Sequence, residues 1–304
     1  MGLRRSGGAR SRPAALRGLR AAIYTCTFRD YDNLLSPLAA TPGCAHLHFS
    51  DRRAPLTPGW RFRPLPRAAA GRPTNEANRY CKILAHRVLP QVDLSVYVDG
   101  NILLRADLSP MMAEFLDSGA DLALFRHEVP GWTVEDDITR ALETGRVAPG
   151  RRAAARRLLE DARAEGRAGL PVTSNAVLFR RHDRPALADL LDAWWQETAR
   201  TAMRDQFTLP GLLAGSGLRV HYWPWHYRDP ANGVFASVPH RGPAPRRWGV
   251  LSELQAASVT RARYSPVDRL IQRRLVGPAR RALGRPDTPP DLLRPAARPQ
   301  PEGE

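Results

Sequence analysis

The stretch Leu94-Ser-Val-Tyr-Val-Asp-Gly-Asn101 places an apolar run of strand length directly before an acidic turn. A strand that is buried on both faces of a parallel sheet has a largely apolar sequence of this kind. In open α/β sheets the ligand crevice lies beyond the carboxyl ends of the strands. The stretch therefore predicts an α/β fold with a ligand site at Asp99-Gly100-Asn101.

The turn offers two oxygen donors. Asp99 and Asn101 are two residues apart and are expected to point the same way, while Gly100 lets a ligand approach the backbone. Oxygen donors of this kind suit Mg²⁺ or Mn²⁺ held together with substrate phosphates. The alternative is an Asp-Gly-Asn turn that only closes the strand.

Short apolar runs and longer stretches of helical period alternate through the middle of the chain. This pattern is typical of an α/β domain with a largely parallel sheet. We expect one such domain over residues 21–250. Strands are predicted at 22–25, 46–50, 61–65, 94–98, 122–125, 176–179 and 219–223, and helices at 75–89, 109–117, 151–165 and 184–199.

The predicted helix 75–89 carries a basic stripe. Arg79, Lys82 and His86 follow at spacings of three and four, which places them on one helix face. Lys82 is the single lysine of a chain with 46 basic residues, and a compact point charge suits a phosphate. A diphosphate needs such a stripe near the acidic turn. The alternative is a solvated cationic face.

Three further segments hold candidate site residues. Asn175 opens a predicted strand and can meet a ligand hydroxyl, although turn roles are common for asparagine. Asp205 and Gln206 can form hydrogen bonds with a sugar, or Asp205 can serve as a helix N-terminal cap. The histidines at 221, 226 and 240 lie among tryptophans and can offer a third metal ligand, although a lone histidine is more often structural.

The net charge of +16 is concentrated at the two ends of the chain. Residues 1–20 hold six arginines and no acid, and residues 261–304 hold ten arginines against five acids. Both ends are rich in Gly, Pro and Ala, so 1–20 and 251–304 are expected to be disordered tails, with a short helix near 267–275. Charge alone therefore does not indicate a specific nucleic-acid partner.

The sequence contains no stretch that approaches the ~18 apolar residues of a membrane span, and no apolar run follows the N-terminal arginines. We expect a cytoplasmic protein, with basic tails that could bring it to the anionic inner face of a membrane. The cysteines Cys26, Cys44 and Cys81 show no paired spacing and are expected to be buried reduced thiols.

Taken in order, several segments resemble the TOD/MUCI-type glycosyltransferase-like domain family, formerly a domain of unknown function. The resemblance covers roughly residues 21–240, and the ordered set of motifs carries it. The matching segments are Ile23-Tyr-Thr-Cys-Thr-Phe-Arg-Asp-Tyr-Asp32, Asn78-Arg-Tyr-Cys-Lys-Ile-Leu-Ala-His-Arg87, Ser95-Val-Tyr-Val-Asp-Gly-Asn-Ile102, Asp121-Leu-Ala-Leu-Phe-Arg-His127, Ala176-Val-Leu-Phe-Arg-Arg-His-Asp183, Trp194-Trp195 and Arg204-Asp-Gln-Phe207.

The resemblance implies a single GT-A-like, nucleotide-diphospho-sugar transferase domain with a mostly parallel central sheet flanked by helices. In that fold an Asp-x-Asp-like turn holds a divalent cation against the donor diphosphate, and Asp99 and Asn101 fall at this turn. Asn101 replaces a second carboxylate, which makes a third ligand such as His240 more important.

The resemblance also implies roles for the remaining candidates. The predicted donor-binding residues are Arg29 and Asp30 near the nucleotide base, with Arg79, Lys82, His86 and Gly100 at the diphosphate. The predicted sugar and acceptor residues are Asn175, Asp205 and Gln206.

Three functions follow as hypotheses. The first is a glycosyltransferase that uses a nucleoside-diphosphate sugar donor, an unknown glycan or lipid-linked acceptor, and Mn²⁺ or Mg²⁺. The second is a hydrolase that acts on a phosphorylated or lipid-like substrate. The third is a non-enzymatic nucleic-acid-binding protein, which rests on charge alone.

Overall fold

The computed structural model describes residues 13–28, 34–53, 59–201 and 204–237. The strands are β1 (Ala21–Cys26), β2 (Cys44–Ser50), β3 (Arg61–Pro64), β4 (Leu94–Val98), β5 (Ile102–Leu104), β6 (Leu122–Arg126), β7 (Thr173–Arg181), β8 (Val220–Tyr222) and β9 (Phe235–Ser237). The helices are α1 (Thr74–Ile83), α2 (Ala85–Val88), α3 (Ser109–Asp117), α4 (Val134–Glu143), α5 (Arg152–Ala164), α6 (Pro185–Arg200) and α7 (Asp205–Ala214). Short 3₁₀ turns lie at Ala14–Leu16, Pro149–Arg151 and Pro230–Asn232.

Seven strands form one sheet in the order β3-β2-β1-β4-β7-β6-β8. All neighbours pair in parallel except β7, which runs antiparallel to both β4 and β6. The amino end of β7 consequently lies at the edge where the parallel strands end. The prediction of an α/β protein with a mostly parallel central sheet flanked by helices is confirmed, and each of the seven strands lies where the apolar runs predicted one.

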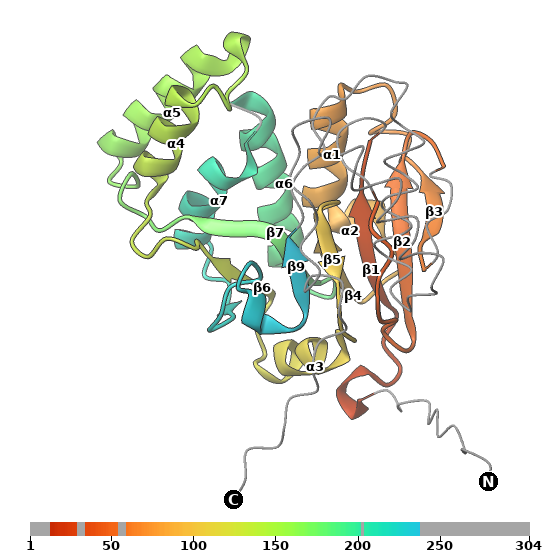
Figure 1. Cartoon of the computed structure of the whole chain (residues 1–304). Helices are drawn as coiled ribbons and strands as arrows, with labels where there is room; N and C mark the ends of the chain where they lie inside the picture. The colour runs from red at the N-terminus through yellow and green to blue at the C-terminus, as the bar shows by residue number, and fades with distance from the viewer. Residues whose placement is uncertain (1–12, 29–33, 54–58, 202–203, 238–304) are drawn as a thin grey trace, which may run out of the picture.

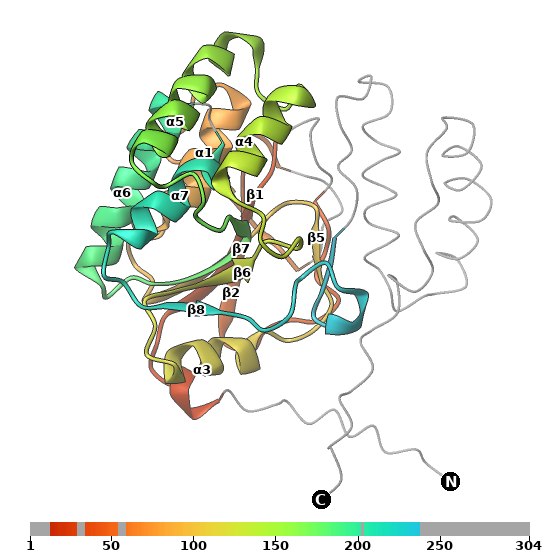
Figure 2. The ribbon, with the colours of Figure 1, turned by 90° about the vertical axis from the view of Figure 1, so that its left-hand side faces the viewer.

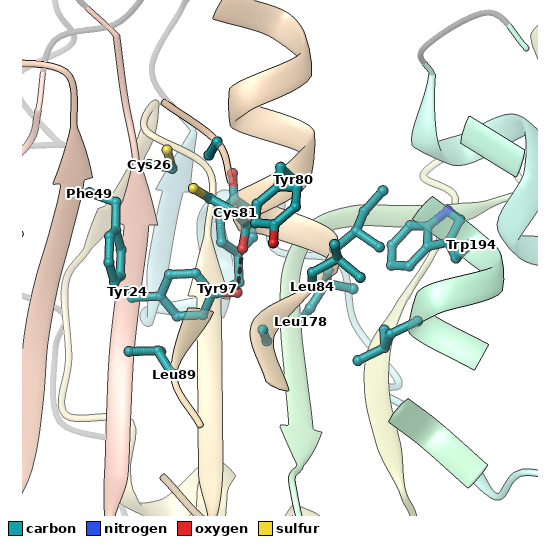
Figure 3. Packing of buried hydrophobic residues seen from close by; sticks show 14 of the residues in the cluster. Tyr24, Cys26, Phe49, Tyr80, Cys81, Leu84, Leu89, Tyr97, Leu178 and Trp194 are labelled. Atoms are coloured by element: carbon teal, nitrogen blue, oxygen red, sulfur yellow. Dashed lines mark hydrogen bonds between the residues drawn. The ribbon is translucent and has the colours of Figure 1, made fainter. Parts of the chain in front are cut away.

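Helices cover both faces of this sheet (Figures 1 and 2). Figure 2 shows α3 on one face and α1, α6 and α7 on the other. Because side chains alternate along a strand, neighbouring residues of β1 enter opposite core layers. Tyr24 packs in the layer with α1 and α6, whereas Ile23 packs in the layer with α3. Figure 3 shows part of the first layer, with Tyr24, Tyr97, Leu178 and Trp194 buried between strands and helices.

The predicted single helix over 75–89 is wrong, because it is divided into α1 and α2 at Leu84. Leu84 has φ −87° and ψ 49°, which is not helical backbone. The sequence pattern missed this break since it contains no Gly or Pro within the helical stretch. Lys82 therefore lies in the last turn of α1, and His86 belongs to the short helix that follows.

Two features were not predicted at all. The first is helix α4, which is preceded by its N-cap Thr133; the side chains of Thr133 and Asp136 form a reciprocal capping box. It packs with α5 and α7 around a separate apolar cluster that includes Ile138 and Leu158. The second is a two-stranded sheet in which β5 pairs antiparallel with β9, so that Ile102 lies opposite Ser237. Each of these two strands has only three residues, so its periodicity is a weak signal in the sequence.

Several predictions lie outside the described residues. These are residues 1–12 of the predicted N-terminal tail, the C-terminal segment 251–304 with its helix near 267–275, and the candidates Arg29, Asp30 and His240. Residues 13–20 of the predicted tail are described: they contain the 3₁₀ turn Ala14–Leu16, Leu16 is buried, and Arg20 pairs with Asp93. Among the residues that are described, Cys26, Cys44 and Cys81 are all free thiols; the first and third are buried and Cys44 is half-buried. No helix in the described part of the chain has the length and apolarity of a membrane span.

Candidate functional site

The candidate site centres on Asp205, the first residue of α7. Its Oδ1 lies 2.9 Å from Arg79 Nε, and its Oδ2 lies 2.8 Å from Lys82 Nζ. Arg79 and Lys82 are three residues apart on α1 and therefore share a helix face, as their spacing predicted. The side chains of Lys82 and Asp205 are each only 4% exposed, so this ion pair is shielded from water.

The same lysine also reaches the predicted acidic turn. Asp99 follows β4, and its backbone N–H donates to the carbonyl of Ala176 on β7 at 2.8 Å. Its Oδ1 lies 3.4 Å from Lys82 Nζ and accepts a hydrogen bond of 2.8 Å from the Tyr97 hydroxyl. The Asp99 side chain is 27% exposed, so the ammonium of Lys82 joins a buried carboxylate to a partly exposed one.

The electrostatics of Asp205 follow from its partners. Burial opposes ionisation, but the charges of Arg79 and Lys82 outweigh it and hold the pKa of Asp205 below its ordinary value. At Tyr97, burial and the negative charge of Asp99 both raise the pKa of the phenol. Asp205 is thus a carboxylate at neutral pH, and Tyr97 is a neutral hydrogen-bond donor.

The amino end of β7 adds polar groups beside Asp99. Asn175 is 2% exposed, and its Oδ1 accepts a hydrogen bond of 2.7 Å from the Thr173 hydroxyl. The Ser174 hydroxyl lies 3.1 Å from Nε2 of His226. Burial and the charge of Asp99 raise the pKa of Tyr227 to about 12, against the charge of Arg228. Tyr227 therefore lies close enough to the acidic turn for the charge of Asp99 to affect its phenol.

Gln206 contacts the same strand. Its Nε2 donates to the Thr173 carbonyl at 3.4 Å, and its Oε1 accepts from Arg204 at 3.3 Å. The indole of Trp194 on α6 donates to the Asp205 carbonyl at 2.9 Å, which ties the start of α7 to α6. The fold thus gathers Asp205, Gln206 and Asn175 around the sheet edge where Asp99 lies.

Two sequence candidates contact other parts of the fold. His86, on α2, lies 3.0 Å from Asp192 of α6 and does not share a continuous helix with Arg79 and Lys82. His221 lies on β8, where its ring packs 4.5 Å from that of Trp223 and its Nε2 is 3.4 Å from Glu114 of α3. Gly100 and Asn101 are both buried next to Asp99.

Sequence reasoning missed three residues near this edge of the sheet: Tyr97, Ser174 and Tyr227. Tyr97 carried a signal, because it lies two residues before Asp99 and strand alternation places both on one face. The other two carried none, since the position of Ser174 at this edge depends on the antiparallel strand β7, and the nearness of Tyr227 to Asp99 depends on the loop after β8.

The described residues supply part of a ligand set for a divalent cation. Asp99 and Asn101 supply one carboxylate and one amide, both oxygen ligands of the kind that Mg²⁺ and Mn²⁺ accept alongside substrate phosphates. No group of three or more His, Cys, Asp or Glu side chains is placed to hold a metal within the ranges that the structure describes. His240, the predicted third ligand, lies beyond them.

Comparison with known proteins finds solved structures that resemble this fold, but it assigns the chain to no family. No family model matches the chain, and no curated protein matches it. Mouse xyloside xylosyltransferase 1, in its apo form, aligns at 12% identity and a TM-score of 0.43 over 67% of this chain and 85% of its own. The apo structure of the bifunctional glycosyltransferase WbbM aligns at 12% identity and a TM-score of 0.41 over 68% of this chain.

This chain spans 39% of the length of the WbbM structure. Both TM-scores lie below 0.5, so neither likeness carries an argument about activity. The fold assignment accordingly rests on the strand order and the strand directions, and the functional assignment on the geometry around Asp99 and Asp205.

Proposed function

We propose that this chain is a GT-A-like glycosyltransferase that transfers a sugar from a nucleoside-diphosphate sugar to a glycan or lipid-linked acceptor. The observation that carries the proposal is the buried cluster in which Lys82 contacts both Asp205 and Asp99 at the edge where the parallel strands end. Ligands of open α/β sheets bind beyond this edge.

The cations of the cluster suit a diphosphate leaving group. As the bond from the sugar to the diphosphate breaks, negative charge grows on the leaving oxygen, and preorganised positive groups stabilise it. Lys82 supplies an ammonium next to the partly exposed carboxylate of Asp99, and Arg79 supplies a guanidinium on the same helix face. Asp205 fixes both cations before the donor arrives, so little reorganisation is needed.

The remaining residues have roles in orientation. Asp205, Gln206 and Asn175 would hold hydroxyl groups of the sugar or acceptor, since carboxylate and amide groups accept and donate such bonds. A bound Mn²⁺ or Mg²⁺ would add charge neutralisation at the diphosphate, with Asp99, Asn101 and His240 as its protein ligands. Arg29, Asp30 and Gly100 would contact the nucleotide side of the donor.

Donor binding is the most direct test. The full chain is mixed with UDP-, GDP- and dTDP-sugars, with and without Mn²⁺, and its melting temperature and the release of free sugar are measured. One donor class should raise the melting temperature, because a ligand that binds the folded state stabilises it. Asp99→Ala should remove the Mn²⁺-dependent part of both signals.

The control is Asp183→Ala, which removes a half-exposed carboxylate paired with Arg181 and should leave donor binding unchanged. A chain that no nucleotide sugar stabilises, yet that hydrolyses a phosphorylated substrate, would support the hydrolase hypothesis instead. Full Mn²⁺-dependent activity in Asp99→Ala would contradict the metal assignment.

A further inference from the structure

Arg180 is an arginine in the middle of the core. It lies on β7, and its exposed fraction is 0%. Its guanidinium donates through Nη1 to the backbone carbonyls of Lys82 and Ile83, and through Nη2 to the Tyr24 hydroxyl at 2.8 Å. In the described part of the chain, all of these contacts are to uncharged oxygen atoms, although a buried charge usually takes a carboxylate partner.

The carbonyls that Arg180 contacts belong to the end of α1. The last carbonyls of a helix have no N–H partner of their own and carry the negative end of the helix dipole. A buried guanidinium at this position supplies donors and compensating charge together. Arg180 thus provides hydrogen-bond partners at a helix end that has neither Gly nor Pro.

Tyr24 completes the arrangement. Its hydroxyl donates to the Cys81 carbonyl at 3.0 Å, with the Lys82 carbonyl also near at 3.4 Å, and it accepts from Arg180. Tyr24 and Cys81 are drawn together in Figure 3, where the ring of Tyr24 lies below the end of α1. Two side chains from the central sheet, Tyr24 and Arg180, therefore donate hydrogen bonds to the backbone carbonyls of the turn that carries Lys82.

Lys82 is consequently held at both ends. Its backbone carbonyl accepts from Arg180, and its ammonium contacts Asp205 at 2.8 Å and Asp99 at 3.4 Å. A lysine side chain has large rotamer freedom, so the position of its ammonium depends on a fixed backbone origin. Small errors in the placement of a charged group are costly where the group acts on a reacting atom.

We propose that Arg180, together with Tyr24, is a positioning residue that sets where the ammonium of Lys82 lies. Arg180 acts through the backbone at the end of α1 and does not itself contact the ligand. The consequence for donor binding rests on the proposed function, whereas the placement of Lys82 does not.

The single lysine makes this placement measurable. Labelling the full chain with ¹³C,¹⁵N-lysine gives a Cε–Hε signal from one residue alone, Lys82. The reactivity of the same amine is followed with N-hydroxysuccinimidyl acetate, by mass spectrometry of the peptide that contains it. The variants are Arg180→Met, which keeps the aliphatic stem, and Tyr24→Phe, which removes only the hydroxyl.

Arg152→Met is the matched control. Arg152 also donates to a carbonyl in the last turn of a helix, Leu142 on α4, at 2.9 Å, and it is remote in sequence from the turn that holds Lys82. We expect the Cε–Hε signal to move in Arg180→Met and in Tyr24→Phe but not in Arg152→Met. Lys82 should be acetylated about tenfold faster in Arg180→Met, since hydrogen bonds that involve a charged group are lost.

A lower global stability alone does not move the native signal of Lys82, so the spectrum separates placement from folding. If both variants fold and their Lys82 signal and acetylation rate equal those of the unaltered chain, the proposal is overturned. If Arg180→Met does not fold, Tyr24→Phe decides: an unchanged signal overturns the proposal and a moved signal supports it.

Titration with UDP separates this inference from the proposed function. A Lys82 signal that responds to UDP in the unaltered chain supports donor binding at the cluster. If that signal responds to neither UDP, GDP nor dTDP but moves in Arg180→Met and Tyr24→Phe, the positioning role stands while the proposed donor site fails.

Discussion

Lys82 Nζ and Asp205 Oδ2 lie 2.8 Å apart in a part of the core where each side chain is 4% exposed. One comes from the last turn of α1 and the other from the first residue of α7. Arg79 holds the second oxygen of the same carboxylate. Removing Asp205 therefore affects two cations at once.

Asp205→Asn should lower the free energy of unfolding by about 3–5 kcal/mol, because the removal of one partner leaves a buried charge uncompensated. Urea unfolding at pH 7 measures this. The control Glu197→Gln breaks an ion pair with Arg200 on the surface of α6 and should cost at most about 1 kcal/mol. Equal losses in the two variants would mean that the Asp205 cluster is as solvated as a surface pair.

Lys82→Met should weaken binding of the free nucleoside diphosphate about tenfold or more, since hydrogen bonds to charged groups are worth about 1.5–3 kcal/mol. Calorimetric titration with UDP or GDP measures the affinity. Arg67→Met removes an exposed arginine after β3 and tests whether the loss is only a general effect of net charge. The same decrease in both variants would count against a specific phosphate role for Lys82.

Trp194→Phe should cost about 1–3 kcal/mol of stability through the hydrogen bond alone, because the buried Asp205 carbonyl loses its donor. The neighbouring Trp195→Phe is the comparison. The Trp195 ring is half-buried, and its centroid lies 5.4 Å from that of the Tyr80 ring. Chemical unfolding of both variants gives the difference. A larger loss in Trp195→Phe would show that ring packing outweighs the contact with Asp205.

The stability of the protein should fall as pH decreases from about 6.5 toward 4. Burial lowers the pKa of His48 to about 4, and burial with the charge of Arg180 does the same at His182. Between these values the unfolded chain binds more protons than the native state, so acid favours unfolding. Above about pH 6.5 both states hold neutral histidines and this contribution is complete.

His48→Gln and His182→Gln should each reduce the slope of unfolding free energy against pH in that window and leave the slope above pH 7 unchanged. Urea unfolding at several pH values from 4.5 to 8 provides the comparison, with the range above pH 7 as the internal control. If the slope below pH 6.5 is the same in both variants as in the unaltered chain, other groups cause the loss of stability in acid.

Much of the fold could be predicted from local pattern. The strands were found because seven apolar runs alternate with helical stretches, and the position of Asp99 at a strand end followed from the run 94–98 alone. The shared face of Arg79 and Lys82 followed from helix geometry. The break at Leu84 and the pairing of β5 with β9 were missed because their causes lie in distant segments or in too few residues. Helix α4 was missed although its capping residues, Thr133 and Asp136, are a local signal in the sequence.

The sequence by itself determined the α/β class, the acidic turn after β4 and the basic face of α1, because each depends on residues close together in the chain. The tertiary structure decided which of these groups meet. It brought Asp205 between Arg79 and Lys82, placed β7 antiparallel so that Asn175 lies beside the turn, and set Arg180 under the end of α1. Such contacts depend on strand order and helix packing, and no local periodicity encodes them.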